Sequence, residues 1–587
     1  MASISQFIKE LRRRDVFRTG VAYLVVAWLL IQLSDILLET FAAPTWAMRA
    51  VVIALAAGFP VVLMLAWVYE ITTQGVKRTA QVSEGELISA HGGRQVDFVI
   101  IGVLMVAVAL FAADRFRWID FGIVPSIELR SIAVLPFDNL SGDPEQEYFS
   151  DGMTETLITE LSKISALRVI SRQSVMRFKG TNEALPDIAR KLNVDALVEG
   201  SALLIGEQVR ITVQLIEAAT DRHLWADNYD RELSDVLALH SEVARSIAHK
   251  IRITVTPEEA THLASVREVN PEAYRLYLLG QHHLYKWEPA DLDKAIRYFQ
   301  QAIEVDPQYA QPHAGLAKVY GAIGFYGHLR PRDSFEKERA AAAAALEIDS
   351  NLADAHGEYA LVYFYFDWDW QKAEEEFLRT ISLNSNYAYA HQFYAWFLVA
   401  MGHTKEAHTS IKTALQLDPL ALLAYMTASD VYYFSRQYDK AITRLHEALD
   451  LFPNHPFAHA RLGWSYVQKG MFEKAIGESQ RAVTLSPDIT EHLWMLGYAY
   501  AAAGQTTEAR KILDDLHDLA KKQYVHAYGF ALIHIGLGEN DEALEWLERA
   551  YQDRNAWMPF MQVAAPLDPL RSDPRFQDLL RRMNFPE

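Results

Sequence analysis

Long runs of apolar residues are confined to the beginning of the chain. They extend over about residues 20–38, 47–71 and 96–113. A helix needs roughly 17–25 apolar residues to cross the hydrocarbon core of a bilayer, so these runs predict three transmembrane helices. Pro60 lies inside the second run, where a membrane helix tolerates a kink. We therefore expect residues 1–120 to form a membrane anchor in contact with the lipid bilayer.

The flanks of these segments differ in lysine and arginine content. The N-terminal flank and the second loop hold five and three such residues, whereas the first loop and the flank after the third segment hold one and two. Cytoplasmic flanks are the more basic ones. This predicts a multi-pass bacterial inner-membrane protein with a cytoplasmic N-terminus, in which the chain after about residue 114 is periplasmic. A cleaved signal peptide is the alternative for the first segment, but two further spans argue against it.

Beyond the third segment, short apolar strands alternate with amphipathic helices. The run Ser131–Phe137 is almost entirely apolar, as in a strand that is covered on both faces. The stretches Ala196–Leu204 and Gln208–Glu217 flank a turn at Gly206 and form a predicted hairpin. We expect a small α/β domain over residues 126–256. Its other predicted elements are strands at Leu167–Ser171 and His223–Tyr229, and helices from Met153, at Asp187–Asn193 and from Leu233 to about Ile251.

A 34-residue period marks the C-terminal half of the chain. One alanine per repeat, a small residue twelve positions earlier and a proline at the end of three repeats carry the period. Two antiparallel helices that cross closely at small residues produce this pattern, which is typical of tetratricopeptide (TPR) repeats. The positions are Ala373, Ala407, Ala441, Ala475, Ala509 and Ala543; Ala395, Ser429, Gly463, Gly497 and Ala531; and Pro419, Pro453 and Pro487.

Two earlier repeats fit the same pattern with insertions, and the second has an insertion before a predicted helix at Ala340–Ile348. About eight repeats are therefore expected between Asn270 and roughly Asp553. The sequence DPLRSDPRFQDLLRRM after them resembles a capping helix with a polar outer face. Residues 270–587 should form an all-α, right-handed superhelical TPR solenoid.

The concave surface of this solenoid is the predicted binding site for proteins or peptides. First-helix positions outside the packing pattern point into it, and aromatic and arginine side chains are common binding hot spots. Two interpretations stay open for each such residue: contact with a partner, or packing between helices. The residues are Tyr389, Gln392, Trp396, Asp430, Arg461, Trp464, Trp494 and Tyr498.

Charge and composition limit the choice of partner. The chain of 587 residues has a formal net charge of −19. Residues 1–125 hold 11 Lys and Arg against 10 Asp and Glu, so the remainder carries −20. Nucleic-acid binding needs a basic surface, and we expect no nucleic-acid partner. The absence of cysteine excludes disulfides, thiolate metal sites and cysteine nucleophiles.

No motif indicates catalysis or a bound cofactor. Phosphate-binding glycine loops, nucleophile elbows and HExxH zinc motifs are missing from the sequence. His455 and His459 have the spacing of a ligand pair, but Pro456 follows the first of them, which favours a surface pair. We therefore expect a non-enzymatic protein that binds no metal or cofactor.

An acidic turn precedes the helix that is predicted from Met153. Its carboxylates lack the regular spacing of a calcium-binding loop, so solvated side chains are favoured over a cation site. Asp151 or Ser150 is expected to cap the helix. The carboxylates are those of Asp143, Glu145, Glu147 and Asp151.

Two runs in the predicted α/β domain resemble a known family. SIAVLPFDNLSGDPEQEYFSDGMTETLITELS and DALVEGSALLIGEQVRITVQLIEAATDRHLWADNYDR look like the TolB amino-terminal-like module. The resemblance implies an envelope-facing bacterial binding module with an uncharacterised ligand, often placed between a membrane helix and a TPR array. Similar regions also occur fused to winged-helix DNA-binding or class III nucleotide cyclase domains. Only about 19 residues precede the first apolar segment here, so we expect neither domain in this chain.

These features lead to two hypotheses about function. The first is a membrane-anchored scaffold whose TPR groove and TolB-like module recruit or sense envelope proteins. The alternative is a signal-transducing receptor subunit related to cyclase- or transcription-factor-linked sensors. Three membrane helices are more than an anchor needs, which adds a membrane-protein partner or a homo-oligomer to the expected contacts.

Overall fold

The computed structural model describes residues 20–28, 30–31, 45–72, 75–78, 129–264 and 268–585. The chain consists of two compact units, Met1–Ser126 and Ile127–Glu587. The third predicted membrane segment, residues 96–113, lies outside the described residues.

The first unit contains two packed helices and a β-hairpin. Helix α3 (Thr45–Val68) contains Pro60, and helical residues 20–28 and 30–31 lie beside it. The Tyr23 hydroxyl donates to the Leu55 carbonyl at 2.7 Å and leaves no room for a side chain at Gly58. The predicted second span continues to residue 71, whereas α3 ends at Val68. The chain then pairs β1 (Tyr69–Thr72) with β2 (Gly75–Arg78).

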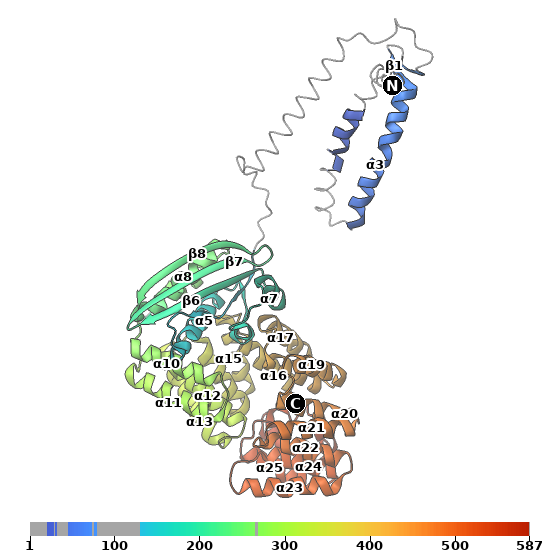
Figure 1. The fold of residues 1–587 in the computed structure, drawn as a ribbon. Coiled ribbons are helices and arrows are strands. Elements are labelled where there is room, and N and C mark those ends of the chain that lie inside the picture. Colours follow the sequence, from blue (N-terminus) through green and yellow to red (C-terminus); the bar gives the residue numbers. More distant parts are fainter. Residues whose placement is uncertain are drawn as a thin grey trace. The chain divides into compact units, whose positions relative to one another are not determined.

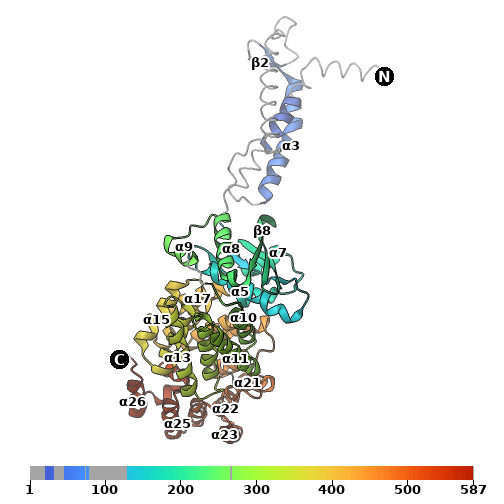
Figure 2. The same cartoon turned by 90° about the vertical axis from the view of Figure 1, so that its left-hand side faces the viewer.

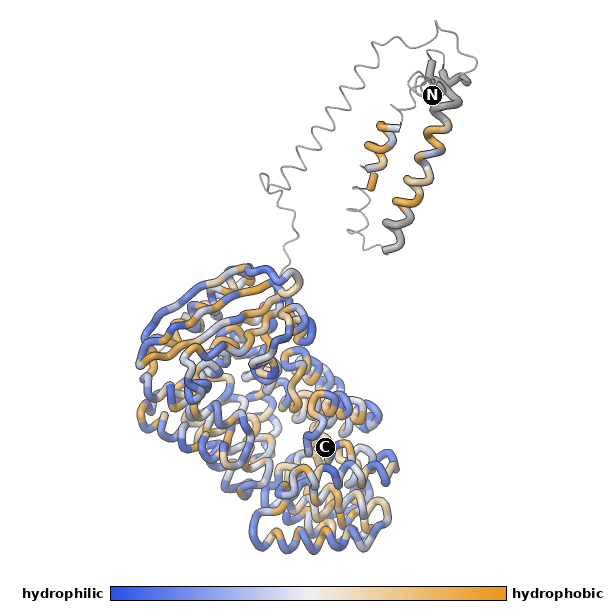
Figure 3. The backbone as a smooth tube through the Cα atoms, viewed as in Figure 1, coloured by the Kyte–Doolittle hydropathy of each residue, from blue (hydrophilic) through white to orange (hydrophobic). Residues whose placement is uncertain are grey.

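The described parts of these two helices are mostly apolar (Figure 3). Several of their large apolar side chains are exposed, among them Leu24 at 56%, Ile53 at 68% and Met64 at 70%. Within the parts of the chain that the structure describes, no helix combines the length and the hydropathy that a bilayer span requires. The membrane anchor stays a prediction.

The second unit begins with a six-stranded mixed sheet. Its strands are β3 (Ser131–Val134), β4 (Asp138–Asn139), β5 (Arg168–Val169), β6 (Ala196–Ile205), β7 (Gln208–Glu217) and β8 (Arg222–Glu232). The order is β5-β3-β6-β7-β8, with β4 beside β6. β3 is parallel to β5 and β6, and the last three strands form an antiparallel meander. All four residues of β3 are buried, and β7 buries alternate apolar residues, as the apolar patterns predict.

Helices connect the strands and cover the sheet. They are α5 (Glu147–Ser162), α6 (Arg172–Val175), α7 (Leu185–Leu192), α8 (Val236–Lys250) and α9 (Pro257–Ala264). The start that the sequence predicts for α5 is wrong, because the helix begins at Glu147. Neither Ser150 nor Asp151 caps it, since both lie inside its first turns. Asp143 instead caps the short 3-10 turn Pro144–Gln146 by accepting from the Glu145 amide.

Helices α10 to α25 form eight successive pairs in the described chain, and each pair packs against its neighbours (Figures 1 and 2). The pairs are α10 (Pro271–Leu284) and α11 (Pro289–Val305); α12 (Ala310–Phe325) and α13 (Pro331–Ile348); α14 (Ala353–Val362) and α15 (Trp370–Leu383); α16 (Ala388–Ala400) and α17 (Thr404–Leu417); α18 (Leu422–Phe434) and α19 (Tyr438–Leu451); α20 (Pro456–Gln468) and α21 (Phe472–Leu485); α22 (Thr490–Ala502) and α23 (Thr506–Ala520); and α24 (Ala527–Leu537) and α25 (Asn540–Gln552).

Local sequence explains where these helices cross and where they begin. A methyl group at Gly463 would lie 2.9 Å from the carbonyl oxygen of Ala475, so the small residue allows α20 to approach α21. The predicted start of the helix near Ala340 is wrong, because α13 begins at Pro331. Proline is preorganised for the first position of a helix, and the last four residues of the predicted insertion GFYGHLRPRDS form the first turn of α13.

After α25 the chain leaves the repeat pattern. The 3-10 turns η6 (Met558–Phe560) and η7 (Ala565–Leu570) precede the last helix, α26 (Pro574–Arg582). We refer to Asn555–Leu570 as the C-terminal segment. It belongs to the same apolar core as the repeats.

Candidate protein-binding groove

The α/β domain lies against the repeats (Figures 1 and 2). Buried polar contacts join the two. The Asn386 side chain accepts from the Val169 amide at 3.1 Å. Its amide group donates to the carbonyls of Ser162 at 3.0 Å and Leu167 at 2.8 Å. A single side chain of the array therefore satisfies three backbone groups, one at the end of α5 and two in or next to the edge strand β5.

A second docking contact joins Asp418 to α6. The Asp418 carboxylate accepts from the Ser174 amide at 3.1 Å and from its hydroxyl at 2.6 Å. Burial raises the pKa of Asp418 to about 6, although the hydrogen bonds from Ser174 and Ser171 act in the opposite direction. Both contacts link residues that are more than 200 positions apart in the sequence.

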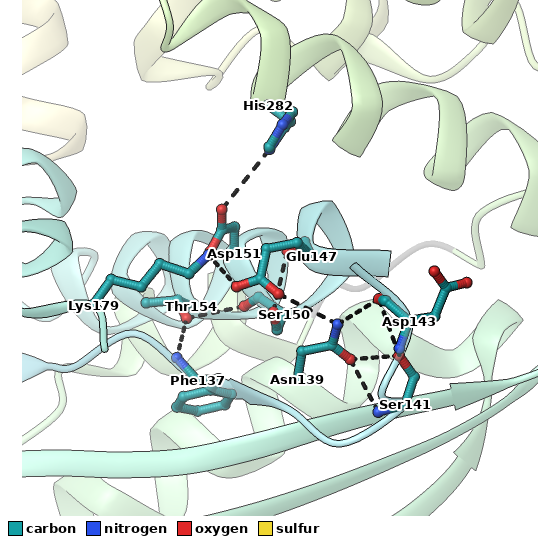
Figure 4. Close-up of polar contacts among 10 residues, drawn as sticks. All are labelled: Phe137, Asn139, Ser141, Asp143, Glu147, Ser150, Asp151, Thr154, Lys179 and His282. Carbon is teal, nitrogen blue, oxygen red and sulfur yellow. Dashed lines mark hydrogen bonds and ion pairs between the residues drawn. The ribbon is translucent and has the colours of Figure 1, made fainter. Parts of the chain in front are cut away.

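The turn DNLSGDPEQEYFSDG forms an internal hydrogen-bond network (Figure 4). The Asn139 side chain accepts from the Ser141 amide and donates to the Asp143 carbonyl at 2.8 Å. The Thr154 hydroxyl accepts from the Phe137 amide at 2.9 Å and donates to the Ser150 carbonyl at 3.0 Å. The turn therefore positions α5 relative to the sheet.

Two acidic side chains of this turn share one lysine (Figure 4). Lys179 forms ion pairs with both Glu147 and Asp151, and His282 on α10 lies 3.8 Å from the second Asp151 oxygen. Burial raises the pKa of Asp151, but the nearby His282 and the paired Lys179 outweigh burial and leave the pKa lowered. Asp151 therefore stays ionised at the contact between α5 and the first repeat.

Gly152 explains how closely these two helices approach. A Cβ atom at this position would lie 2.6 Å from the nearest methyl carbon of Leu278 on α10. Asp151 and Gly152 thus act at the same contact between α5 and α10: the first provides a charge, and the second allows the two helices to approach closely.

Within the described residues, no group of three or more histidine or acidic side chains could hold a metal ion. Among the carboxylates of the acidic turn, Asp143 caps the 3-10 turn, and Glu147 and Asp151 pair with Lys179. His455 precedes α20, and His459 Nδ1 lies 2.6 Å from Glu478.

A cavity of about 1100 Å³ lies between the α/β domain and the concave side of the first four repeats. Helix α5 and the start of α6 line one side, and first helices α10, α12, α14 and α16 line the other. The lining combines tyrosines, amides and charged groups. Such a mixture suits a ligand with both apolar and hydrogen-bonding groups.

The charged groups of the cavity are paired with its tyrosines. Arg172 Nε lies 3.2 Å from Glu155, and its guanidinium carbon lies 4.1 Å from the centre of the Tyr285 ring. Burial raises the pKa of Glu155, while Arg172 and Lys318 counteract the shift. Lys318 Nζ lies 4.3 Å from the centre of the Tyr389 ring. Cationic donors and a carboxylate therefore face the same cavity.

The structure divides the eight predicted groove residues into two groups. Tyr389 and Gln392 line the cavity, and the Gln392 carbonyl oxygen is buried with no hydrogen-bond partner among the described residues. The other six are buried. Trp396, Trp464, Trp494 and Tyr498 belong to the apolar core that also contains the C-terminal segment, and Asp430 and Arg461 are buried charged residues. Binding of a partner at any of the eight stays a prediction.

Sequence reasoning missed the residues that the α/β domain contributes. Glu155 lies one helical turn after Asp151 on α5, and this i, i+4 spacing was the available signal. Arg172 on α6, and Lys318 on α12 and Asp354 on α14 of the repeats, also line the cavity. They carried no comparable signal, because only the docking of the domain brings them together.

Fold and groove together define a TPR protein with a small mixed α/β domain docked on its repeats. Residues 128–249 match the family described as "HilA/YgeH-like transcriptional regulator, second domain". Residues 283–309, 426–489 and 461–524 match tetratricopeptide repeat families. The α/β domain is therefore HilA-like, and its description as TolB-like stays a prediction.

Two relatives and one solved structure are similar to parts of the chain. The Rhizobium meliloti (strain 1021) protein named "Putative adenylate cyclase 3" is 37% identical over 231 residues, which are 39% of this chain and 39% of that protein. Transcriptional regulator HilA of Salmonella typhimurium is 21% identical over 328 residues, 54% of this chain and 56% of that protein. A tetratricopeptide repeat protein from Parabacteroides merdae has a TM-score of 0.34 and 13% identity, covering 46% of this chain and 100% of that one. The chain thus spans 39% to 56% of the two relatives' lengths.

Proposed function

We propose that this chain is the input component of a signal-transduction system, a receptor subunit that binds a protein segment and catalyses no reaction itself. The two relatives are named for different outputs, an adenylate cyclase and a transcriptional regulator. A region that accompanies different outputs is better suited to detecting a signal than to executing a response. This argument supports the receptor hypothesis over the scaffold hypothesis.

The observation that carries the proposal is the partly open cavity between the α/β domain and the repeats. A peptide segment in this cavity would contact α5 on one side and the first helices of the repeats on the other. Lys318 and the unpaired Gln392 oxygen offer a donor and an acceptor for its backbone. A bound segment would stabilise one arrangement of the domain on the repeats, and an effector could recognise that arrangement.

The proposal includes the membrane anchor and the periplasmic location of the receptor. Three apolar runs of suitable length support it, as do the exposed apolar side chains on the first two helices. A lipid environment would remove those apolar side chains from contact with water.

A photo-crosslinking amino acid at Gln392 in the full-length protein, expressed in its native host, tests this function. The matched control carries the same group at Lys412, an exposed position on the second helix α17. We expect an adduct from position 392 alone, and its loss in a Lys318→Ala background. Co-purification of a cytoplasmic effector with the adduct would support the receptor. Envelope proteins alone would support the scaffold, and equal labelling from both positions would contradict both functions.

A further inference from the structure

The C-terminal segment lies across the concave face of the later repeats. The Trp557 ring centre is 5.6 Å from that of Trp464 on α20 and 6.3 Å from that of Trp494 on α22. Phe560 stacks on Phe434 of α18 at 4.6 Å with an interplanar angle of 10°. Two aromatic side chains, three positions apart, therefore fill the surface that a TPR array offers to a partner.

An ion pair also fixes the orientation of the C-terminal segment on the repeats. Arg436, in the turn after α18, donates two hydrogen bonds to the Asp568 carboxylate, at 2.6 and 2.8 Å. The hydrogen bond from Arg436 lowers the pKa of Asp568. Such two-point guanidinium–carboxylate pairs define orientation as well as attraction.

The segment differs from the repeats that it contacts. Its backbone forms the short 3-10 turns η6 and η7, separated by irregular chain, and it does not continue the helix pairs. It is held mainly by side chains that enter the groove, as a bound peptide would be.

The surface beneath Trp557 is unusually polar for a permanent core. Arg461 is 3% exposed and lies 3.1 Å from both Asp430 and Glu491. Its guanidinium carbon is 4.6 Å from the centre of the Trp557 ring. Apolar residues of similar volume stabilise a permanent core at least as well as buried ions do. Charges at this position are advantageous if water reaches the surface part of the time.

Unpaired polar atoms beneath the segment support the same conclusion. The indole nitrogens of Trp464 and Trp494 and the Tyr528 hydroxyl are buried without a hydrogen-bond partner among the described residues. All three residues contact Trp557. A buried polar group that loses its water without gaining a partner destabilises the docked state. Docking of the segment is therefore weaker than its aromatic contacts alone would make it.

We propose that the C-terminal segment is a displaceable intramolecular ligand, and that the groove beneath it is a second protein-binding surface. The partner that fits is a peptide segment of the same chemistry: a tryptophan, an aromatic residue three positions later and a carboxylate about eight positions beyond that. This surface is distinct from the cavity under α5, and the proposal does not depend on the receptor function.

Hydrogen exchange in the unaltered full-length protein tests displacement directly. The amides of Met561 and Ala564 donate within the segment at 3.0 and 2.9 Å, so their exchange reports its opening. We expect them to exchange at least tenfold faster than the central amides of α20 and α22. Equal protection of segment and helices would overturn the proposal, because the segment would then open only with the repeats.

A labelled peptide of residues 554–573 tests the binding surface. We expect it to bind at least tenfold more tightly to the full-length Trp557→Ala/Phe560→Ala protein than to the unaltered protein, because the weakened segment competes less. A peptide with the same two substitutions should bind neither protein. Trp546→Ala, which removes a tryptophan stacked on Phe530 of α24, is the control variant. It should bind the peptide no more tightly than the unaltered protein does.

Fluorescence anisotropy provides the affinities, and circular dichroism checks folding. A folded double variant that binds the native peptide no better than the unaltered protein would refute the proposed surface. If the double variant fails to fold, the exchange measurement on the unaltered protein decides the question.

Discussion

Glutamine in place of Glu358 is expected to stabilise the TPR array increasingly as the pH rises from about 4.5 to about 8. Glu338 on α13 and Glu358 on α14 are 0% and 1% exposed. None of their four carboxylate oxygens has a hydrogen-bond partner among the described residues. Burial raises the pKa of Glu358 to about 8, and burial together with the charge of Glu358 raises that of Glu338.

The sign of the pH dependence follows from these shifts. The Glu358 carboxyl has an ordinary pKa of 4.5 but is held protonated to about pH 8 in the folded array. The folded state binds more protons than the unfolded state in this window, so the contribution of Glu358 to stability falls as the pH rises from 4.5 to 8. About 2.5 pH units separate the ordinary pKa from pH 7, which corresponds to a penalty of roughly 3 kcal/mol. Glutamine cannot ionise and avoids this penalty.

Urea unfolding at pH 5.5 and pH 8, followed by tryptophan fluorescence, measures the effect. We expect the midpoint of Glu358→Gln to exceed that of the unaltered protein by more at pH 8 than at pH 5.5. Glu347→Gln changes an exposed glutamate on α13 and should leave both midpoints in place. A Glu358→Gln protein with the pH dependence of the unaltered protein would refute the reasoning, because Glu358 would then not be held protonated.

Three further predictions concern packing, docking and topology. Gly463→Ala should destabilise the array by about 1–3 kcal/mol, since its methyl group meets the Ala475 carbonyl at 2.9 Å; Gly477→Ala, with no neighbour within 4 Å, should instead stabilise α21 by up to about 1 kcal/mol. Urea midpoints that move in the same direction for both variants would contradict this explanation. Asn386→Ala should cost about 1–3 kcal/mol, because it leaves buried backbone groups unpaired; hydrogen exchange should accelerate in β5, and unchanged β5 protection would show that the contact is dispensable. Reporter fusions at residue 120 and at the C-terminus should be active only when the reporter works outside the cytoplasm, and activity of the cytoplasmic reporter would reverse the predicted orientation.

Short-range patterns predicted much of the helical fold. The 34-residue alanine period anticipates the regular helix pairs from α14 to α25 because each TPR repeat packs mainly on its neighbours. The alternation of polar and apolar residues along Gln208–Glu217 identifies β7, because successive side chains of a pleated strand point to opposite faces of the sheet. Helix starts were less accurate. α5 begins at Glu147 and α13 at Pro331, and each helix has a buried phenylalanine, Phe149 or Phe335, before its predicted start.

Only the tertiary structure decided which groove residues are accessible. The sequence alone determined that Trp464, Trp494 and Arg461 occupy first-helix positions, because local periodicity specifies the face of a helix. It did not reveal that Trp557, some 60 to 100 positions further on, covers them. Nor did it reveal that Asn386 reaches the edge of a sheet more than 200 residues earlier. Such contacts join residues that are far apart in the sequence, and no short-range pattern specifies which distant elements pack together.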